Sequence, residues 1–180
     1  MFFYGGILGH AQGLQTVVQA ARKSLEKSEI KVILQGAGPE KEELMQLKEE
    51  IGATNVYFLP PVPKSEMPSV LKAVDVALVP LRKLELFTGA IPSKIFEALA
   101  MEKPLLLGVD GEAKHHFIDK GDAGIFFEPE NVSDLAEKML EFASSSELIR
   151  SKGRNGRIYV KEHFNRNKIA SDFIDELQKH

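Results

Sequence analysis

Short apolar runs alternate with amphipathic stretches along the whole chain. Continuous apolar runs of a few residues predict buried strands, and apolar residues that recur every three or four positions predict helices. The expected strands cover residues 2–4, 30–34, 56–59, 75–79, 105–107 and 123–127. The expected helices cover residues 14–25, 39–51, 65–73, 93–101, 114–120, 132–142, 147–163 and 168–178, with Ser65 and Ser93 as N-caps.

Strands that alternate with helices indicate an α/β protein. The pattern predicts a Rossmann-like, doubly wound parallel sheet of about six strands with extra helices at the C-terminal end. Because no internal repeat or linker is visible, we expect residues 1–180 to form one domain. Glycine and proline fall at the ends of the expected strands, at Gly5-Gly6, Gly36, Pro60 and Pro80. Such sheets bind ligands at the carboxyl ends of their strands, so we expect the functional site there.

Composition narrows the class of protein. The chain has 180 residues, of which 43% are hydrophobic and 27% charged, so it can build a core. The net charge of −3 argues against a nucleic-acid partner, which requires a basic surface. The absence of cysteine excludes disulfides, thiolate metal sites and a cysteine nucleophile. No apolar run approaches the roughly 20 residues of a transmembrane helix, so we expect no direct membrane insertion.

Residues 1–9 look like a strand followed by a glycine turn. They lack the basic segment and the long apolar run of a signal peptide. Since the chain begins inside a fold element, we expect it to be a piece of a longer protein.

The most informative segment is the loop and helix start from Ile91 to Glu97. Pro92 and Ser93 open a short helix, and a helix N-terminus with its unpaired N–H groups attracts anions. Lys94 adds a full positive charge for a phosphate, and Glu97 can accept hydrogen bonds from sugar hydroxyls. Taken singly, Lys94 is better explained as solvated surface charge, and Glu97 as a residue that complements the helix dipole. Together, after a strand end, they indicate a ligand that carries a diphosphate beside a ribose, such as a nucleotide-sugar.

Two glycine-rich turns are further candidates. The segment from Gly5 to Leu14 joins the first strand to the first helix, and its glycines permit close approach to a ligand, although a tight turn explains them equally well. It also carries His10, a candidate residue facing the expected cleft. The turn from Gly36 to Pro39 is better explained as structural when taken alone. The backbone of 56–62 could read the edge of a base, although a stiff loop is the simpler interpretation.

The other charged and histidine residues give weaker indications of a functional site. Arg82 and Lys83 could neutralise phosphate but fit a loop surface better. His115 and His116 are adjacent and share no helix face, so we expect no metal site there. No Ser/His/Asp grouping or carboxylate pair suited to general acid and base catalysis stands out.

Five motifs, in order, resemble the C-terminal, donor-binding domain of a GT-B glycosyltransferase of the group 1 family (family 4). The resemblance covers nearly the whole chain. The motifs are the first loop (5–14), a hydrophobic-x-G-x-G-P turn (34–39), a base-contact strand (56–60), an A-D-hydrophobic-P strand (73–80) and an E-A-hydrophobic-A-x-x-x-P helix and strand (92–104).

The resemblance implies residue roles. Glu97 would bond the ribose hydroxyls, the backbone at Ser93 and Lys94 would hold the distal phosphate, and Gly5 and Gly6 would let the first loop approach the diphosphate. Lys94 and Glu97 are the expected catalytic residues. The expected donor contacts are Gly5, Gly6, Gln12, Gly36, Gly38, Phe58, Pro60, Ile91, Ser93, Lys94 and Glu97.

The chain departs from the family pattern at three places. Gly6 and Gln12 stand where the family often has arginine and lysine, and Gly89 stands where its first motif glutamate would be. Lys94, with Arg82, would then supply the charge that stabilises the leaving diphosphate. The variant pattern resembles a subgroup that acts in bacterial surface-polysaccharide synthesis, in part on deoxy-amino sugars.

The resemblance therefore implies binding of a nucleoside-diphosphate sugar, with UDP as the expected nucleotide, for retaining transfer in capsule, O-antigen or exopolysaccharide synthesis. It implies no cofactor and no metal. An acceptor glycan or lipid-linked sugar would bind an N-terminal domain that this chain lacks, so the chain alone would be inactive. The expected location is the cytoplasm, with peripheral association at the inner membrane through the rest of the protein. Alternatives are a nucleotide-sugar epimerase, a non-catalytic nucleotide-binding module, and a receiver-like or flavin-binding domain.

Overall fold

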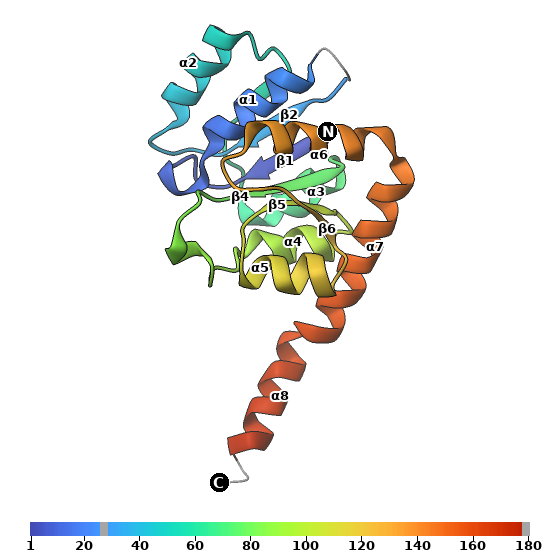
Figure 1. Cartoon of the computed structure of the whole chain (residues 1–180). Coiled ribbons are helices and arrows are strands. Elements are labelled where there is room, and N and C mark those ends of the chain that lie inside the picture. The colour runs from blue at the N-terminus through green and yellow to red at the C-terminus, as the bar shows by residue number, and fades with distance from the viewer. Residues whose placement is uncertain (26–28, 178–180) are drawn as a thin grey trace.

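Six parallel strands form one sheet in the order β3-β2-β1-β4-β5-β6 (Figure 1). The computed structural model describes residues 1–25 and 29–177. The sheet confirms the expected fold class and strand number. The strands are β1 (Phe2–Gly5), β2 (Val32–Gln35), β3 (Val56–Leu59), β4 (Val76–Pro80), β5 (Leu105–Gly108) and β6 (Gly124–Phe126).

The order of the strands reverses at β1. Phe3 pairs with Ile33 of β2 on one side and with Ala77 of β4 on the other. The connections after β1 and β4 thus leave the sheet in opposite directions, which opens a crevice at the carboxyl ends of these two strands. This order differs from that of receiver-like and flavodoxin-like sheets, so that alternative is wrong.

Alternating residues of the strands pack on the two opposite faces of the sheet. Val76 and Leu78 of β4 pack with one group of helices, and Ala77 and Val79 pack on the opposite face. This two-sided burial explains why the strands are apolar without interruption. The first face is covered by α1 (Leu14–Ser24), α2 (Lys41–Ile51) and α6 (Val132–Ser144), and the second by α4 (Lys94–Ala100), η4 (His115–Lys120) and α7 (Ser146–His163).

Several helix starts differ from the sequence expectation. Ser65 lies within the 3-10 turn η2 (Lys64–Glu66), and α3 (Met67–Lys72) begins after it. Ser93 precedes α4, but within the described residues its side chain makes no cap hydrogen bond. The N-cap predicted at Ser65 is therefore wrong, whereas Ser93 occupies the predicted N-cap position without capping the helix through its side chain.

The expected helix over 114–120 begins earlier and changes its winding. It starts as α5 (Glu112–Lys114) and continues as the π-helical η4. Two further 3-10 turns, η1 (His10–Gln12) and η3 (Glu85–Phe87), lie in the loops after β1 and β4. These loops lie at the carboxyl edge of the sheet, where the site is expected.

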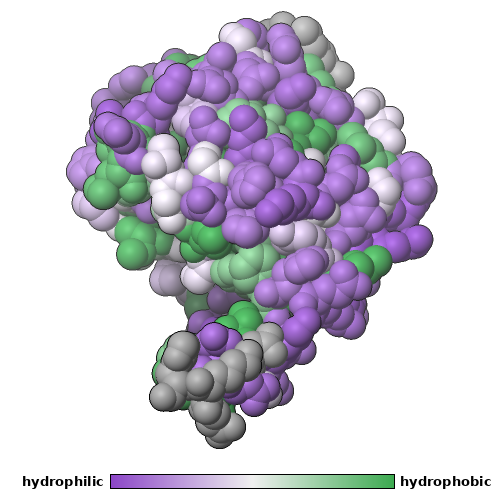
Figure 2. Space-filling view, turned by 60° about the horizontal axis from the view of Figure 1, so that its bottom comes forward, coloured by the Kyte–Doolittle hydropathy of each residue, from purple (hydrophilic) through white to green (hydrophobic). Residues whose placement is uncertain are grey.

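The last helix, α8 (Arg166–Leu177), extends away from the body of the domain (Figure 1). The expected end of this helix at Gln178 lies outside the described residues. Large apolar side chains of α8 are exposed, among them Ile169, Phe173 and Leu177. Elsewhere, the face turned forward in Figure 2 is largely hydrophilic, with hydrophobic groups in separate patches. Within the described residues, no helix combines the length and apolar character needed to cross a membrane.

Candidate functional site

Backbone hydrogen bonds join the loops that follow β1, β2 and β3. The amide of Gly6 donates to the carbonyl of Gln35 over 3.0 Å, and the amide of Gly36 donates to the carbonyl of Leu59 over 3.0 Å. A Cβ atom at Gly36 would lie 1.8 Å from the Gly6 carbonyl oxygen, so only glycine fits there. The predicted site residue Gly36 thus holds the loops together.

A cavity of about 380 Å³ opens at the carboxyl end of β1, and we call it the β1 cavity. Predicted site residues from two distant segments line it together. They are Gly5, Gly6, Gln12, Ser93, Lys94 and Glu97. A second hollow of about 330 Å³ shares Gly6 with it and includes Gly36. The sequence thus located the cavity, because parallel strands bring their loops to one edge.

Lys94 places its ammonium group beside Tyr4 and Gly6 at the start of the first loop. Its ammonium nitrogen lies 3.7 Å from the centre of the Tyr4 ring, a cation–π contact. A Cβ atom at Gly6 would lie 3.1 Å from the same nitrogen. The ammonium group therefore occupies space beside the position where the family often carries an arginine.

The surroundings of Lys94 change its acidity. Burial lowers the pKa of the Lys94 ammonium group to about 8, and the carboxylate of Glu97 opposes this shift. The ammonium group is therefore mainly protonated at pH 7, and burial leaves its positive charge with little water around it. A phosphate that enters the cavity would find this cation already partly stripped of water.

Tyr4 supports both the loop and Lys94. It is fully buried, and its hydroxyl donates to the carbonyl oxygen of Ile7 over 2.6 Å. Burial raises the pKa of Tyr4, so the hydroxyl keeps its proton. Sequence analysis missed this residue, although a polar aromatic side chain directly before Gly5-Gly6 was a visible signal.

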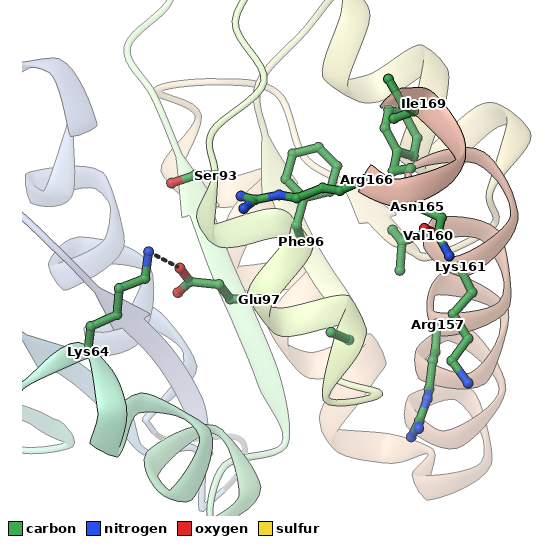
Figure 3. Close-up of a pocket in the computed structure, with 12 residues that line it drawn as sticks. Lys64, Ser93, Phe96, Glu97, Arg157, Val160, Lys161, Asn165, Arg166 and Ile169 are labelled. Atoms are coloured by element: carbon green, nitrogen blue, oxygen red, sulfur yellow. Dashed lines mark ion pairs between the residues drawn. The ribbon is translucent and has the colours of Figure 1, made fainter. Parts of the chain in front are cut away.

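Glu97 projects from α4 toward Lys64, which sequence analysis also missed. The Oε1 atom of Glu97 lies 3.6 Å from the Lys64 ammonium nitrogen (Figure 3). The side chains are 40% and 89% exposed, so solvent weakens this ion pair and a ligand hydroxyl can compete for the carboxylate.

Four predicted donor contacts line neither hollow in the described part of the chain. Gly38 is one of them, and the other three are Phe58, Ile91 and Pro60. Phe58 is half-buried against the core that includes α1, and Ile91 packs against the core below α4. Pro60 is exposed. The loop after β3 contributes Pro61 and Val62 to these hollows instead.

The turn around Gly38 supports the first loop from behind. A Cβ atom at Gly38 would lie 2.2 Å from the carbonyl oxygen of Leu8. The amide of Leu8 also donates to the carbonyl of Ala37 over 2.9 Å. Gly38, another predicted site residue, therefore makes room for the backbone of the first loop.

Arg82 and Lys83 bond to acidic residues after β6. The Nε atom of Arg82 lies 3.3 Å from Glu130, and the Lys83 ammonium group pairs with Glu128. As far as the described residues extend, neither cation lines the β1 cavity. Arg82 contacts the first loop through its backbone instead, since its amide donates to the carbonyl of Ala11 over 2.9 Å, whereas Lys94 lines the β1 cavity.

The histidines serve other contacts. His10 Nδ1 lies 2.6 Å from Oε1 of the buried Glu40, which ties the first loop to the start of α2. His116 contacts Glu112 and the hydroxyl of Tyr159. Within residues 1–25 and 29–177, no group of three or more His, Asp and Glu side chains could hold a metal ion.

Solved structures share this fold. HepE from Anabaena, crystallised with UDP-glucose, superposes with a TM-score of 0.83 at 18% identity, over 99% of this chain and 48% of that one. TarM of S. aureus, in a complex that contains UDP, gives 0.82 at 16% identity, over 97% and 34%. The C-terminal domain of LpcC from Francisella tularensis gives 0.76 at 21% identity, over 92% and 85%.

Curated proteins match in sequence. WcaI of Escherichia coli, named for glycosyl transfer in colanic acid biosynthesis, is 24% identical over 99% of this chain and 43% of its own length. N-acetyl-alpha-D-glucosaminyl L-malate synthase of Bacillus anthracis is 29% identical over 89% and 40%. The chain thus spans less than half the length of these relatives.

The family described as glycosyl transferases group 1 matches residues 1–159, which is most of the chain. The epimerase alternative is therefore disfavoured, and the resemblance drawn from the five motifs is confirmed. The chain belongs to the group 1 glycosyl transferase family.

Proposed function

We propose that the chain is the donor-binding domain of a retaining glycosyltransferase and binds a nucleoside-diphosphate sugar in the β1 cavity. One observation carries this proposal. Gly6, from the loop after β1, and Lys94 and Glu97, both from α4, line one cavity at the point where the strand order reverses. A glycine backbone that a ligand can approach closely, a cation and a carboxylate suit a diphosphate beside a ribose.

Lys94 takes the diphosphate in this proposal. Its ammonium group is held over Tyr4 and directed at the space beside Gly6. Sugar transfer leaves a nucleoside diphosphate, so negative charge develops on the leaving group in the transition state. A preorganised cation stabilises that charge without a metal or another cofactor.

Glu97 takes the ribose hydroxyls. Its carboxylate is accessible and paired only weakly with Lys64. Hydrogen bonds from a sugar to a charged acceptor contribute more than those between neutral groups, so this contact would anchor the nucleoside half.

UDP is the nucleotide we propose. HepE was crystallised with UDP and with UDP-glucose, and TarM in a complex that contains UDP. A role in bacterial surface-polysaccharide synthesis fits the name of WcaI, and an amino-sugar donor fits the name of the malate synthase. The acceptor, a glycan or lipid-linked sugar, would bind another domain of a longer protein.

A non-catalytic nucleotide-binding module is the second candidate. Gly6 and Gln12 favour it, because both stand where the family often carries cations. The position of Lys94 beside Gly6 weighs against it, since one cation is restored from another segment.

Calorimetric titration with UDP, GDP and uridine tests the donor proposal. We expect saturable UDP binding that is tighter than binding of uridine or GDP. Tighter binding of GDP than of UDP would show that the donor carries GDP instead of UDP. Equal affinity for UDP and uridine would contradict the diphosphate site. Absence of binding by all three would favour neither Lys94 nor Glu97 as a ligand contact and would overturn the proposal for this domain.

A further inference from the structure

We propose that a further hollow, between α4 and the junction of α7 with α8 and distinct from the two described above, binds a phosphate group through Arg166. We call it the α4–α8 hollow; its volume is about 560 Å³, larger than that of the β1 cavity. The donor proposal assigns no role to Arg166, although Glu97, its ribose contact, also lines this hollow.

Positive charge dominates the lining of the hollow. Its four cationic side chains face a single carboxylate, that of Glu97. Arg157 is compensated by Glu102 at 3.0 Å, and Lys64 by Glu97. Among residues 1–25 and 29–177, Arg166 and Lys161 make no ion pair, so two charges are left for an anion.

Arg166 is the cation directed into the hollow. Its side chain starts at the beginning of α8 and lines the same hollow as Phe96 and Ser93 (Figure 3). The Ser93 hydroxyl is free of any cap bond in the described structure and lines the same hollow. A guanidinium group and a hydroxyl that line one hollow offer it donors that phosphate oxygens accept.

An apolar floor lies beside these donors. The rings of Phe96 and Phe164 stand 5.2 Å apart between centroids, and Val160 and Ile169 extend the surface. The floor suits an aromatic or aliphatic group attached to the phosphate. The ligand is therefore a phosphate that carries an apolar body rather than a bare inorganic ion.

The hollow also adjoins the β1 cavity. Lys64, Ser93 and Glu97 line both spaces. The phosphate has two sources in this geometry: the diphosphate of the proposed donor itself, or a separate molecule that binds next to it. Only the first source rests on the proposed function.

Phenyl phosphate is a suitable probe, since it joins an aromatic ring to a phosphate. Its affinity is measured by calorimetry for the free protein and for the protein saturated with UDP. We expect Arg166→Ala to weaken phenyl phosphate binding roughly tenfold, and Arg166→Lys to weaken it less. Arg150→Ala is the matched control, because Arg150 is an exposed arginine of α7 that pairs with Glu147 outside the hollow.

The outcomes separate the two sources. Binding of phenyl phosphate to the UDP-saturated protein, lost in Arg166→Ala, identifies a separate ligand. Displacement by UDP, with both affinities reduced in Arg166→Ala, identifies the donor diphosphate. If UDP does not bind at all, the donor proposal fails while the free-protein titration still tests Arg166. The inference is overturned if Arg166→Ala leaves phenyl phosphate and UDP affinities unchanged, or if Arg150→Ala reduces them equally.

Discussion

The ammonium group of Lys94 rests on the ring of Tyr4, 3.7 Å from its centre, and fills the space beside Gly6 that a side chain would otherwise occupy. Three residues from two segments thus form one unit. A glycine in the first loop and a lysine in α4 are compatible because each leaves room for the other. The predictions below test this unit and its neighbours.

Lys94→Ala should weaken UDP binding more than uridine binding, because Lys94 acts through phosphate in our proposal. Loss of a charged hydrogen bond costs about 1.5–3 kcal/mol, which is a tenfold to hundredfold change in the dissociation constant for UDP. Calorimetry with both ligands measures the difference. Lys138→Ala, which removes a half-buried lysine of α6 paired with Glu141, is the control. Equal losses for UDP and uridine would contradict the assignment.

Gly6→Ala should displace Lys94 and weaken UDP binding as well. The added Cβ would meet the Lys94 nitrogen at 3.1 Å and the Tyr4 hydroxyl at 3.4 Å, at a backbone φ of +146° that side chains rarely adopt. Gly89→Ala is the matched control, since no described heavy atom lies within 4 Å of a Cβ there. Unchanged UDP affinity in Gly6→Ala, with the fold intact by circular dichroism, would argue against the unit.

Glu97→Ala should weaken UDP and uridine by similar amounts, because both carry the ribose. We expect a loss of about 1–3 kcal/mol in the free energy of binding. Glu43→Gln removes an exposed charge on α2 and should change neither affinity. A folded Glu97→Ala protein with wild-type affinity for both ligands would refute the ribose contact.

The affinity for UDP should fall as the pH rises through about 8. Burial lowers the pKa of Lys94 to about 8, so the ammonium group loses its charge above that pH. The phosphate groups of UDP are already ionised, because their last pKa lies near 6. Between pH 7 and pH 9 we expect a decrease of up to roughly tenfold. In Lys94→Arg the cation stays charged, so a slope equal to that of the wild type would point to another group.

Tyr4→Phe should lower the free energy of unfolding by about 0.5–1.5 kcal/mol, since it leaves the Ile7 carbonyl without its buried hydroxyl partner. The ring that supports Lys94 remains. Chemical denaturation measures the loss, and Tyr57→Phe, at a 45% exposed tyrosine, should have a smaller effect. Equal stability of Tyr4→Phe and the wild type would show that the hydroxyl does not brace the first loop.

The strands and the location of the site could be predicted from the sequence, whereas most side-chain contacts within the site could not. The strands were placed within about two residues because burial on both faces demands uninterrupted apolar runs. Gly6, Ser93 and Glu97 were brought to one site because parallel strands share a carboxyl edge.

The sequence did not reveal the contacts of Lys64 and Tyr4, because these contacts depend on how far single side chains extend between distant segments. Lys64 meets Glu97 across a loop, and Tyr4 meets Lys94 between a strand and a helix; neither pairing has a local signature. Ser65 and Ser93 fit the composition of N-caps, yet neither caps a helix in the described structure. Ser65 lies inside a 3-10 turn, and Ser93 has helical backbone angles (φ −58°, ψ −27°) instead of the extended ones of a capping residue.

The hydrogen bonds between Gly6 and Gln35, and between Gly36 and Leu59, run entirely between main-chain atoms. The frame that these bonds give the β1 cavity requires glycine at position 36 but involves no side chain of Ile7, Gln12 or Val62. Ile7, Gln12 and Val62 can be exchanged without moving that frame, so these positions are where substrate preference can be redesigned while the fold is preserved.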